Sequence, residues 1–417
     1  MSPRATLRAT FVGVVAACLV TACASGPVPT TSSSPAAASS ATRSASTDSE
    51  ATGSASASVP EPVESTVPTP SKAASCSALA ASLTTDQKVG QLFMVGTTST
   101  RVPDSLASVV TEFHLGSVLY LGARNVGVAG TAVQSMEIAA LGEGGIPVLI
   151  AADQEGGLVQ RLQGTGFSTI PSARVQGQMD ADRLRSSWAA WGTEMKRAGV
   201  RYNLAPVADT VPSSLLADNA PIGALRRNFG SEPGDVAVSV ESVVKGLSDA
   251  HVATAVKHFP GLGRVTTNTD FGVAVDDRTT ADDPFLKPFS AAMNAGVSSV
   301  MVSSAIYSKI DPGVPAVHSA AIVTGLLRQK LGWQGVVISD DLGAAASVGA
   351  VPNRERGVRF IAAGGDIVID ADPTSIEAMV GGVLDRVASD RGFADGLNEH
   401  VTRVLELKAS LGLVECG

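Results

Sequence analysis

The stretch ATAVKHF, residues 253–259, shows the pattern from which the fold can be predicted. It begins as a nearly continuous apolar run, which is typical of a parallel strand that is buried on both faces. A strand with one solvated face would instead alternate apolar and polar residues. We therefore expect a buried parallel strand here, with Lys257 and His258 near its carboxyl end.

Seven further stretches have the same character. They are VGQLFMVG (89–96), SVLYLG (117–122), PVLIAAD (147–153), YNLAPVAD (202–209), SSVMVSS (298–304), GVVISDD (335–341) and DIVID (366–370). Amphipathic segments such as Asp180–Ala198 and Pro233–Ala250 separate them, so strands and helices alternate. Eight such repeats predict an α/β fold of the (β/α)8 TIM-barrel type, forming a single catalytic domain over residues 76–417.

The alternative is an open, doubly wound parallel sheet, which the pattern alone does not distinguish from a closed barrel. No glycine-rich dinucleotide fingerprint opens the first strand–helix unit, which favours the barrel. The GLG at residues 261–263 is only weak evidence for a phosphate-binding loop.

Polar residues gather at the carboxyl ends of the predicted strands. They are Asp153, Asp209, Lys257, His258, Ser303, Ser304, Asp340, Asp341 and Asp370. In a barrel these positions converge on one rim, where substrates bind. Burying so many polar groups for stability alone would be costly, so the pattern predicts a functional site.

The first residues predict export. Arg4 and Arg8 precede an apolar run from Ala9 to Val20, as in a secretory signal over residues 1–22. The VTAC that ends at Cys23 resembles a bacterial lipobox, which implies cleavage before Cys23 and acylation of its thiol. The alternative is an ordinary signal peptide with an incidental cysteine. We expect a cell-membrane lipoprotein, anchored on the extracytoplasmic side.

Residues 23–75 are rich in Ser, Ala, Thr and Pro, and residues 24–75 contain no Leu, Ile, Met, Phe, Tyr or Trp. This composition cannot bury enough apolar surface to offset chain entropy, so it predicts a disordered linker. Beyond Cys18 and Cys23, the remaining cysteines are Cys76 and Cys416, at the two ends of the predicted domain. In an oxidising compartment they could form one disulfide; the alternative is two free thiols.

The absence of several catalytic motifs from the sequence narrows the reactions that the protein could catalyse. It has no HExxH motif, no closely spaced cysteine pair and no G-x-S-x-G motif, so we expect neither a metal nor a cofactor. The formal net charge is −8 with no long basic run, which excludes nucleic acid as an expected partner. Carboxylates dominate the predicted rim, and glycoside hydrolysis is the reaction that needs two of them in opposed roles.

Four motifs occur together and in order: DQEGGLVQR (153–161), NLAPVAD (203–209), KHFPGLG (257–263) and LGWQGVVISDDL (331–342). With them the chain resembles the single-domain N-acetyl-β-glucosaminidases of glycoside hydrolase family 3, from about Leu83 to the C-terminus. The resemblance implies that Asp340 is the nucleophile. Asp341 should point to the opposite side of its strand; the alternative is that the Asp pair caps the following helix around Gly343.

The resemblance also implies a set of residues that bind the sugar. They are Asp153, Arg161, Arg227, Lys257 and His258. Two of these assignments have structural alternatives, since His258 could be a buried histidine bonded to the backbone. Arg161 could belong to a surface salt bridge.

The sequence departs from the family in one loop, where the family's Asp-x-His dyad supplies the general acid/base. Asn268 and Asp270 stand at those positions. We infer that Asp270 takes the proton-transfer role with Asn268 orienting it, which requires desolvation or a nearby negative charge such as that of Asp340. The alternative is an Asx-rich turn without a chemical role. Leu158, Leu262 and Ser304 also stand where relatives often carry Arg, His and His.

These predictions describe a monomeric, retaining enzyme that removes terminal β-linked N-acetylglucosamine from peptidoglycan fragments. In certain relatives the histidine acid/base tolerates phosphate as the acceptor of the sugar, which gives phosphorolysis. A carboxylate at Asp270 should repel phosphate, so that water is the preferred acceptor. The alternatives are a β-glucosidase or β-xylosidase of the same family, or a non-catalytic muropeptide-binding lipoprotein. A substrate-assisted mechanism is set aside, because DIVIDADPTSIE (366–377) matches its acidic motif only superficially.

Overall fold

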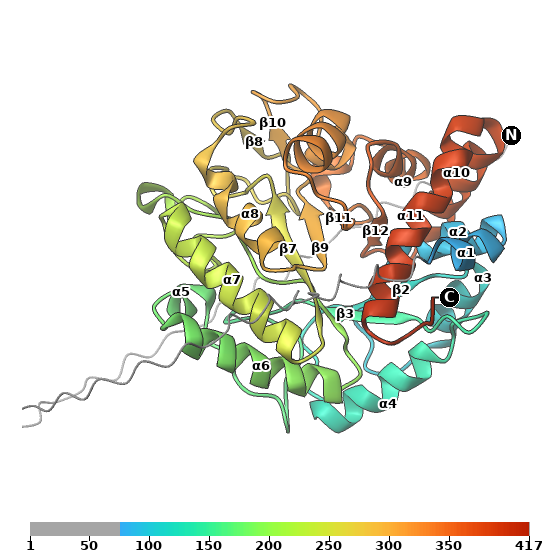
Figure 1. The fold of residues 1–417 in the computed structure, drawn as a ribbon, viewed down its shortest axis with the longest axis horizontal. Helices are drawn as coiled ribbons and strands as arrows, with labels where there is room; N and C mark the ends of the chain where they lie inside the picture. Colours follow the sequence, from blue (N-terminus) through green and yellow to red (C-terminus); the bar gives the residue numbers. More distant parts are fainter. Residues whose placement is uncertain (1–75, 417) are drawn as a thin grey trace, which may run out of the picture. The chain divides into compact units, whose positions relative to one another are not determined.

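The computed structural model describes residues 76–416, and it confirms the (β/α)8 barrel. Eight parallel strands close into a ring in the order β1, β12, β11, β9, β7, β6, β3, β2. Figure 1 labels several of them, including the neighbours β7 and β9. In ring order they span Phe93–Thr97, Ile367–Asp370, Val336–Asp341, Ser299–Val302, Ala253–Phe259, Tyr202–Asn203, Leu149–Ala152 and Ser117–Tyr120. Each overlaps one of the eight predicted stretches, although β1 extends one residue beyond its stretch, to Thr97. The closing pair β1–β12 excludes the open sheet.

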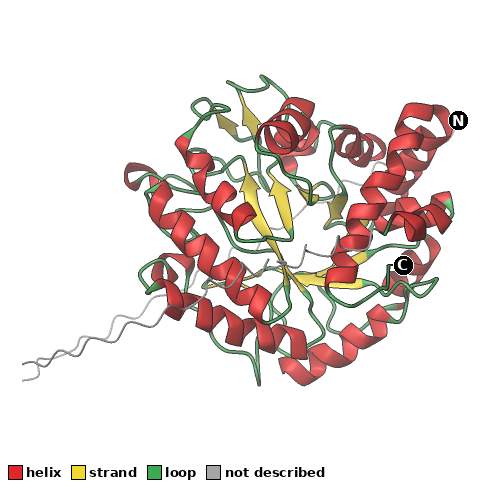
Figure 2. Cartoon of the chain, in the orientation of Figure 1, coloured by secondary structure: helices red, strands yellow, loops and turns green. Residues whose placement is uncertain are grey.

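Helices surround the strands (Figure 2). They are α1 (Ser77–Ser82), α2 (Thr85–Gln91), α3 (Asp104–Glu112), α4 (Gly127–Ala139), α5 (Ala173–Gln176), α6 (Ala181–Arg197), α7 (Pro233–Asp249), α8 (Lys287–Asn294), α9 (Asn353–Ala362), α10 (Ile376–Ser389) and α11 (Arg391–Ser410). A further helical segment spans Ala321–Lys330. The helices α6 and α7 match the segments expected from their amphipathic pattern.

Local sequence signals explain where several of these helices begin. The carboxylate of Asp180 accepts hydrogen bonds from the backbone N–H groups of Asp182 and Arg183, which caps α6. Proline occupies the first turn of α7, where no intrahelical N–H is needed. Thr84 and Gln87 form a capping box at α2, so residues 89–91 of the first predicted strand are helical instead.

Two barrel strands are irregular at the positions that carry functional side chains. The register between β11 and β12 shifts between Ile338 and Asp341, and the register between β7 and β9 shifts between Val256 and Phe259. Such bulges turn side chains away from strict alternation, and they occur often beside active sites. Consecutive residues of these strands can therefore face the same rim.

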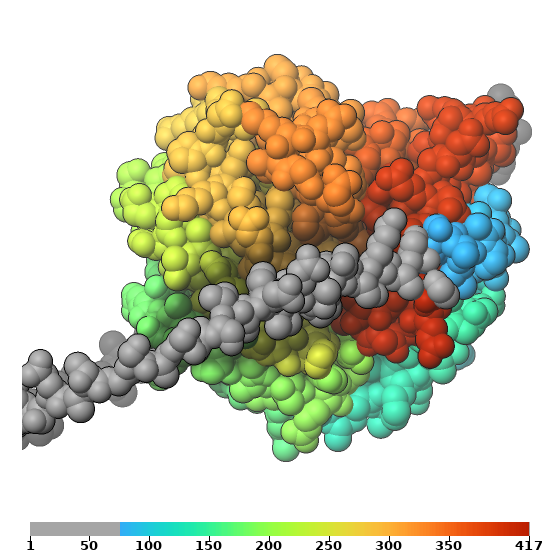
Figure 3. Space-filling view, in the orientation of Figure 1, coloured from blue at the N-terminus to red at the C-terminus, as the bar shows by residue number. Residues whose placement is uncertain are grey.

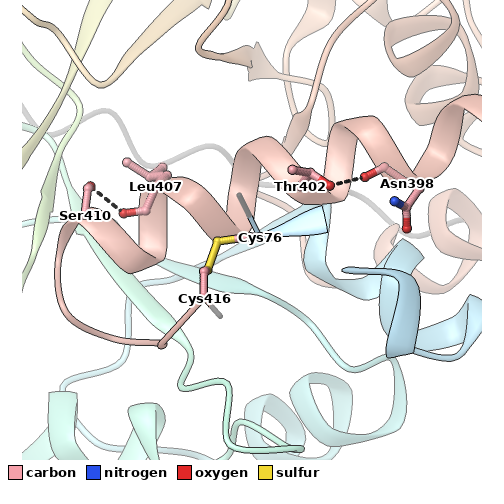
Figure 4. Close-up of a disulfide and its surroundings, with 6 residues drawn as sticks. All are labelled: Cys76, Asn398, Thr402, Leu407, Ser410 and Cys416. Atoms are coloured by element: carbon pink, nitrogen blue, oxygen red, sulfur yellow. Dashed lines mark hydrogen bonds between the residues drawn. A yellow bond between two sulfur atoms is a disulfide. The ribbon is translucent and has the colours of Figure 1, made fainter. Parts of the chain in front are cut away.

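The two ends of the domain are joined by a disulfide between Cys76 and Cys416 (Figure 4). The cysteines are 340 residues apart in sequence, and their Cα atoms are 4.8 Å apart. Cys76 is buried and directly precedes α1, which packs with α2 against α11. Figure 3 shows the same arrangement, with the first described residues beside the C-terminal helices.

Several predictions concern residues outside the described part of the chain. They are the signal segment 1–22, the lipidation site Cys23 and the linker 23–75. Among residues 76–416, no helix combines the length and the apolar character that a membrane span requires. Two short strand pairs lie outside the barrel. β4 (Gln154–Gly156) and β5 (Val159–Gln160) form an antiparallel hairpin, and β8 (Val275–Asp276) pairs in parallel with β10 (Ile306–Tyr307).

Candidate active site

A pocket of about 290 Å³ lies at the carboxyl ends of the barrel strands. Its walls include every catalytic and sugar-binding residue that the sequence predicted. These are Asp153, Arg161, Arg227, Lys257, His258, Asn268, Asp270 and Asp340. The strands place them there because parallel strands in a barrel end at one rim. Their individual roles stay predictions.

Asp340 is a largely buried carboxylate near the end of β11. Burial raises its pKa, and the charges of Asp270 and Asp341 act in the same direction, whereas His258 lowers it. Its carboxylate accepts the backbone N–H of Asp341 at 2.9 Å, and we find no other hydrogen bond to it within residues 76–416. Asp340 therefore faces the pocket with most of its oxygen lone pairs free for a substrate.

The expectation that Asp341 would point to the opposite side was wrong, because both aspartates line the pocket. The bulge in β11 breaks the alternation on which that expectation rested. The carboxylate of Asp341 accepts the N–H groups of Gly343, Ala344 and Ala371. It thus caps the backbone around Gly343 as the alternative supposed, but this backbone forms a turn and not a helix. It also ties the end of β11 to the end of β12.

A buried ion cluster forms one wall. Lys257 Nζ lies 2.5 Å from Asp153 Oδ1 and 2.7 Å from Glu155 Oε1. Arg227 donates to both oxygens of Glu155, at 2.8 and 2.7 Å. Burial would raise the pKa of Glu155, but the two cations together hold it well below its usual range. Conversely, burial would lower the pKa of Lys257, and the carboxylates of Asp153 and Glu155 raise it.

Glu155 was not among the predicted site residues. The only sequence signal for it is its place in the DQEGGLVQR motif, because the burial of Arg227 beside Lys257, which requires a second carboxylate, is visible only in the structure. Glu155 lies in the quoted DQEGGLVQR motif, and the β4–β5 hairpin turns it back toward the barrel. It fixes the positions of Lys257 and Arg227 rather than lining the pocket itself.

His258 is oriented by Asp209. The His258 Nδ1 lies 2.6 Å from Asp209 Oδ2, and the other oxygen of Asp209 accepts the backbone N–H groups of His258 and Leu262. Asp209 is fully buried beneath the rim and does not line the pocket. The ring of His258 does line it, with Nε2 3.5 Å from Arg227 Nη2, so the alternative of a merely backbone-bonded histidine does not hold.

Arg161 presents unused donors. Its guanidinium forms no hydrogen bond or ion pair with residues 76–416, and its Nε is buried. The surface salt bridge that we considered is therefore not observed. A guanidinium with a buried, unpartnered Nε in the wall of a pocket is a candidate for binding an oxygen of a ligand.

The loop from Pro260 to Ala274 carries Asn268 and Asp270. Asn268 Oδ1 accepts the backbone N–H of Asp270 at 3.1 Å, which is an Asx turn, and this turn places Asp270 at the pocket. The turn and the chemical role are thus compatible. Of the two conditions that we named for Asp270, burial does not supply desolvation, because Asp270 is exposed. The other condition, a nearby negative charge, can come from Asp340 in the same pocket.

Backbone contacts hold this loop against the segment that follows β11. The N–H groups of Ala346 and Ser347 donate to the carbonyl oxygens of Asp270 and Thr269, at 3.2 and 3.1 Å. Ser347 Oγ lies 2.8 Å from Ser304 Oγ in a buried pair. Ser304 therefore helps to hold the loop through its hydrogen bond to Ser347, although Ser304 does not line the pocket.

Within residues 76–416 we find no group of three or more His, Cys, Asp or Glu side chains that could hold a metal ion. What the pocket offers is a largely buried carboxylate, that of Asp340, a second carboxylate on a loop, that of Asp270, and several N–H donors. A barrel that brings two carboxylates and sugar-binding donors to its rim has the features of a glycoside hydrolase.

Comparison with known proteins identifies the family. Residues 84–407 match the Glycosyl hydrolase family 3 N-terminal domain, and the chain belongs to this family. Its fold resembles that of a β-N-acetylhexosaminidase from Beutenbergia cavernae, with a TM-score of 0.77 and 43% identity over 79% of this chain and 99% of that one. LpqI of M tuberculosis superposes with a TM-score of 0.71 at 28% identity, over 80% of this chain and 96% of that one.

A sequence relative supports the same grouping. A β-hexosaminidase from Stenotrophomonas maltophilia (strain K279a) is 36% identical over 253 residues, which are 58% of this chain and 72% of that protein. The chain is thus a glycoside hydrolase that acts on O-glycosidic bonds.

Proposed function

We propose that this enzyme is an exo-acting β-N-acetylglucosaminidase that hydrolyses terminal β-linked N-acetylglucosamine and retains the anomeric configuration. Support comes from the similarity to β-N-acetylhexosaminidases and from one structural observation. That observation is the placement of Asp340 beside Asp270 in a pocket whose far wall carries Asp153, Lys257 and His258.

In the first step the donors of the far wall bind the hydroxyls of the terminal sugar, and its anomeric carbon lies at Asp340. One oxygen of Asp340 attacks this carbon and forms an ester bond while the glycosidic C–O bond breaks. The bonding electrons leave with the glycosidic oxygen, which takes a proton from Asp270. The remainder of the substrate departs as an alcohol.

In the second step Asp270, now ionised, removes a proton from water, and the resulting oxygen attacks the anomeric carbon. The ester bond to Asp340 breaks and its carboxylate is restored. Two inversions at one carbon give net retention. Asn268, which holds the backbone of Asp270, keeps the second carboxylate on the side of the departing group.

A fluorinated glycosyl inactivator tests the assignment of Asp340. The covalent intermediate should accumulate, and the labelled peptide should contain residues 336–342. The variant Asp340→Ala should not be labelled. It should also not release p-nitrophenol from p-nitrophenyl N-acetyl-β-glucosaminide, which the wild type should hydrolyse. A label outside this peptide, or turnover without any label, would refute the double-displacement mechanism through Asp340.

The role of Asp270 has its own test. The variant Asp270→Ala should be slow, and azide should restore its turnover of activated substrates because azide can replace water without base catalysis. Absence of rescue would assign proton transfer to another group. Running the same variants on aryl glucosides and xylosides separates the proposed specificity from a β-glucosidase or β-xylosidase. A wild-type protein that binds these sugars without turnover would be a binding protein.

We propose that water is the acceptor in the second step. The carboxylate of Asp270 repels an anionic acceptor such as phosphate, whereas a neutral histidine would not. In phosphate buffer the product should be free N-acetylglucosamine. Sugar 1-phosphate as the main product would contradict the proposal.

We further propose that the enzyme acts on peptidoglycan fragments in the cell envelope, attached by a lipid at Cys23. The disulfide Cys76–Cys416 supports export, because disulfides persist in oxidising compartments. Cys23→Ser should abolish incorporation of a labelled fatty acid and shift the protein from the membrane fraction to the soluble fraction. Unchanged labelling would exclude this attachment site.

A further inference from the structure

Arg356 is a buried cation that lies on α9, outside the active-site pocket. Within residues 76–416 it forms no ion pair, and its guanidinium donates instead to three backbone carbonyl oxygens. Its Nε lies 2.8 Å from the carbonyl oxygen of Val351, and its Nη1 lies 2.7 and 2.9 Å from those of Leu342 and Gly343. Burying a guanidinium without a paired carboxylate is costly, so we expect these three contacts to have a role of their own.

The three carbonyl groups belong to the two ends of one segment, residues 342–351, which joins β11 to α9. Leu342 and Gly343 begin this segment directly after Asp340 and Asp341, and Val351 lies at its other end. A single guanidinium therefore ties the start of the segment to its end.

The start of the segment is fixed against β12. The N–H of Leu342 donates to the carbonyl oxygen of Ile369 at 2.9 Å. Gly343 packs so closely that a Cβ atom there would lie 1.9 Å from Asp370 Oδ1. Because the start cannot move, the contact between Arg356 and Val351 determines where the rest of the segment lies.

The middle of the same segment holds the loop that carries Asp270. The N–H groups of Ala346 and Ser347 donate to the carbonyl oxygens of Asp270 and Thr269. The contacts therefore form one chain, from Arg356 through residues 342–351 to the backbone of Asp270. Asp340 lies at the other end of this chain, immediately before the fixed start of the segment.

We propose that Arg356 is a positioning residue that sets the separation between the carboxylates of Asp340 and Asp270. It touches neither carboxylate, and it acts by holding both ends of the segment that connects them. The proposal rests on the proposed function and adds a residue on which proton transfer depends. Lysine should not replace Arg356, because the planar guanidinium reaches carbonyl groups on both ends at once and an ammonium group lacks this fixed fork.

The variant Arg356→Lys tests the proposal with two substrates. N,N′-Diacetylchitobiose, a disaccharide, needs a proton from Asp270, whereas N-acetylglucosaminyl β-fluoride needs only the attack of Asp340 for the first step, which kcat/KM reports. We expect kcat/KM for the disaccharide to fall about tenfold and that for the fluoride to change less than about twofold, because only the proton donor is displaced. Turnover of the fluoride would also show that the variant is folded.

A double variant tests whether Arg356 acts through the segment. If Arg356 and Ser347 hold the same piece of backbone, Arg356→Lys/Ser347→Ala should lose clearly less on the disaccharide than the product of the two single losses. The matched control is Arg359→Lys, an exposed arginine of the same helix that pairs with Glu355. It should leave both substrates unaffected.

Three results would overturn the proposal. Equal losses on both substrates, with a lower melting temperature, would show that Arg356 only stabilises the fold. Wild-type activity of Arg356→Lys would show that a positive charge suffices, and fully additive losses in the double variant would show that the two residues act separately. If the wild type hydrolysed neither substrate, the proposed function would fail, not this inference alone.

Discussion

Asp340 combines burial with a negative neighbour, and both conditions raise its pKa. A nucleophilic carboxylate acts in its ionised form, so the rate should increase as the pH rises through the pKa of Asp340. Beside it, the ion cluster of Lys257, Arg227 and Glu155 supplies fixed donors without leaving an unpaired buried charge. At the scale of single residues, the site thus combines the poorly solvated carboxylate of Asp340 with two buried cations, Lys257 and Arg227, whose charges are balanced by carboxylates.

The charge of Asp270 should be visible in the pH profile. The variant Asp270→Asn removes a negative charge that raises the pKa of Asp340, so the acidic limb of kcat/KM should move to lower pH. The substrate for this measurement is N-acetylglucosaminyl β-fluoride, because fluoride leaves without a proton. Asp277→Asn, which removes an exposed charge after the same loop, should not move the limb. A shift to higher pH would contradict the coupling.

At the scale of elements, two bulged strands and one fixed loop assemble the site. The bulges in β7 and β11 let Lys257 with His258, and Asp340 with Asp341, face the same pocket. The loop that carries Asp270 is held by the backbone of Ala346 and Ser347, whose segment directly follows the nucleophile strand. The two carboxylates are therefore positioned by one connected piece of structure.

Ser347→Ala should weaken this connection, because it removes the hydrogen bond to Ser304. We expect kcat for the disaccharide N,N′-diacetylchitobiose to fall about tenfold with little change in KM. A misplaced proton donor slows the chemical step more than it weakens binding. The fluoride, which needs no proton, should be nearly unaffected. Ser389→Ala, at an exposed helical serine, is the control. An equal loss on both substrates would indicate a general structural defect rather than displacement of Asp270.

At the scale of the whole molecule, the disulfide closes a loop of most of the domain. Linking residues 340 positions apart reduces the entropy of the unfolded chain. The double variant Cys76→Ala/Cys416→Ala should unfold with a free energy lower by about 2–4 kcal/mol in denaturant titrations. Reductant should lower the stability of the wild type alone. Equal stability of the two proteins would show that the native packing of α1 against α11 makes the link redundant.

A buried lysine makes the stability depend on pH. Lys408 donates to Gln91 Oε1 and to the carbonyl of Pro147, both neutral, and burial lowers its pKa to about 7. The unfolded state therefore binds more protons between about pH 7 and the ordinary lysine value, so this residue makes stability rise with pH across that window. In Lys408→Met this rise should be absent, as measured by denaturation at several pH values. An unchanged slope would contradict the assignment.

The barrel and most of the site could be predicted from sequence because they depend on local patterns. Continuous apolar runs identify buried parallel strands, and polar residues at their ends identify the rim. These properties belong to neighbouring residues, so the eight strands and the polar residues at their ends could be located without coordinates. The resemblance to glycoside hydrolase family 3, and not a local pattern, indicated Arg161, Arg227, Asn268 and Asp270.

What the tertiary structure alone decided are contacts between distant residues. Glu155 beside Arg227, Asp209 beneath His258 and Ser347 beneath the Asp270 loop join segments far apart in the chain. The bulge that turns Asp341 to the pocket arises where β11 pairs with β12. None of these leaves a local pattern, because their energy comes from packing and charge pairing across the barrel.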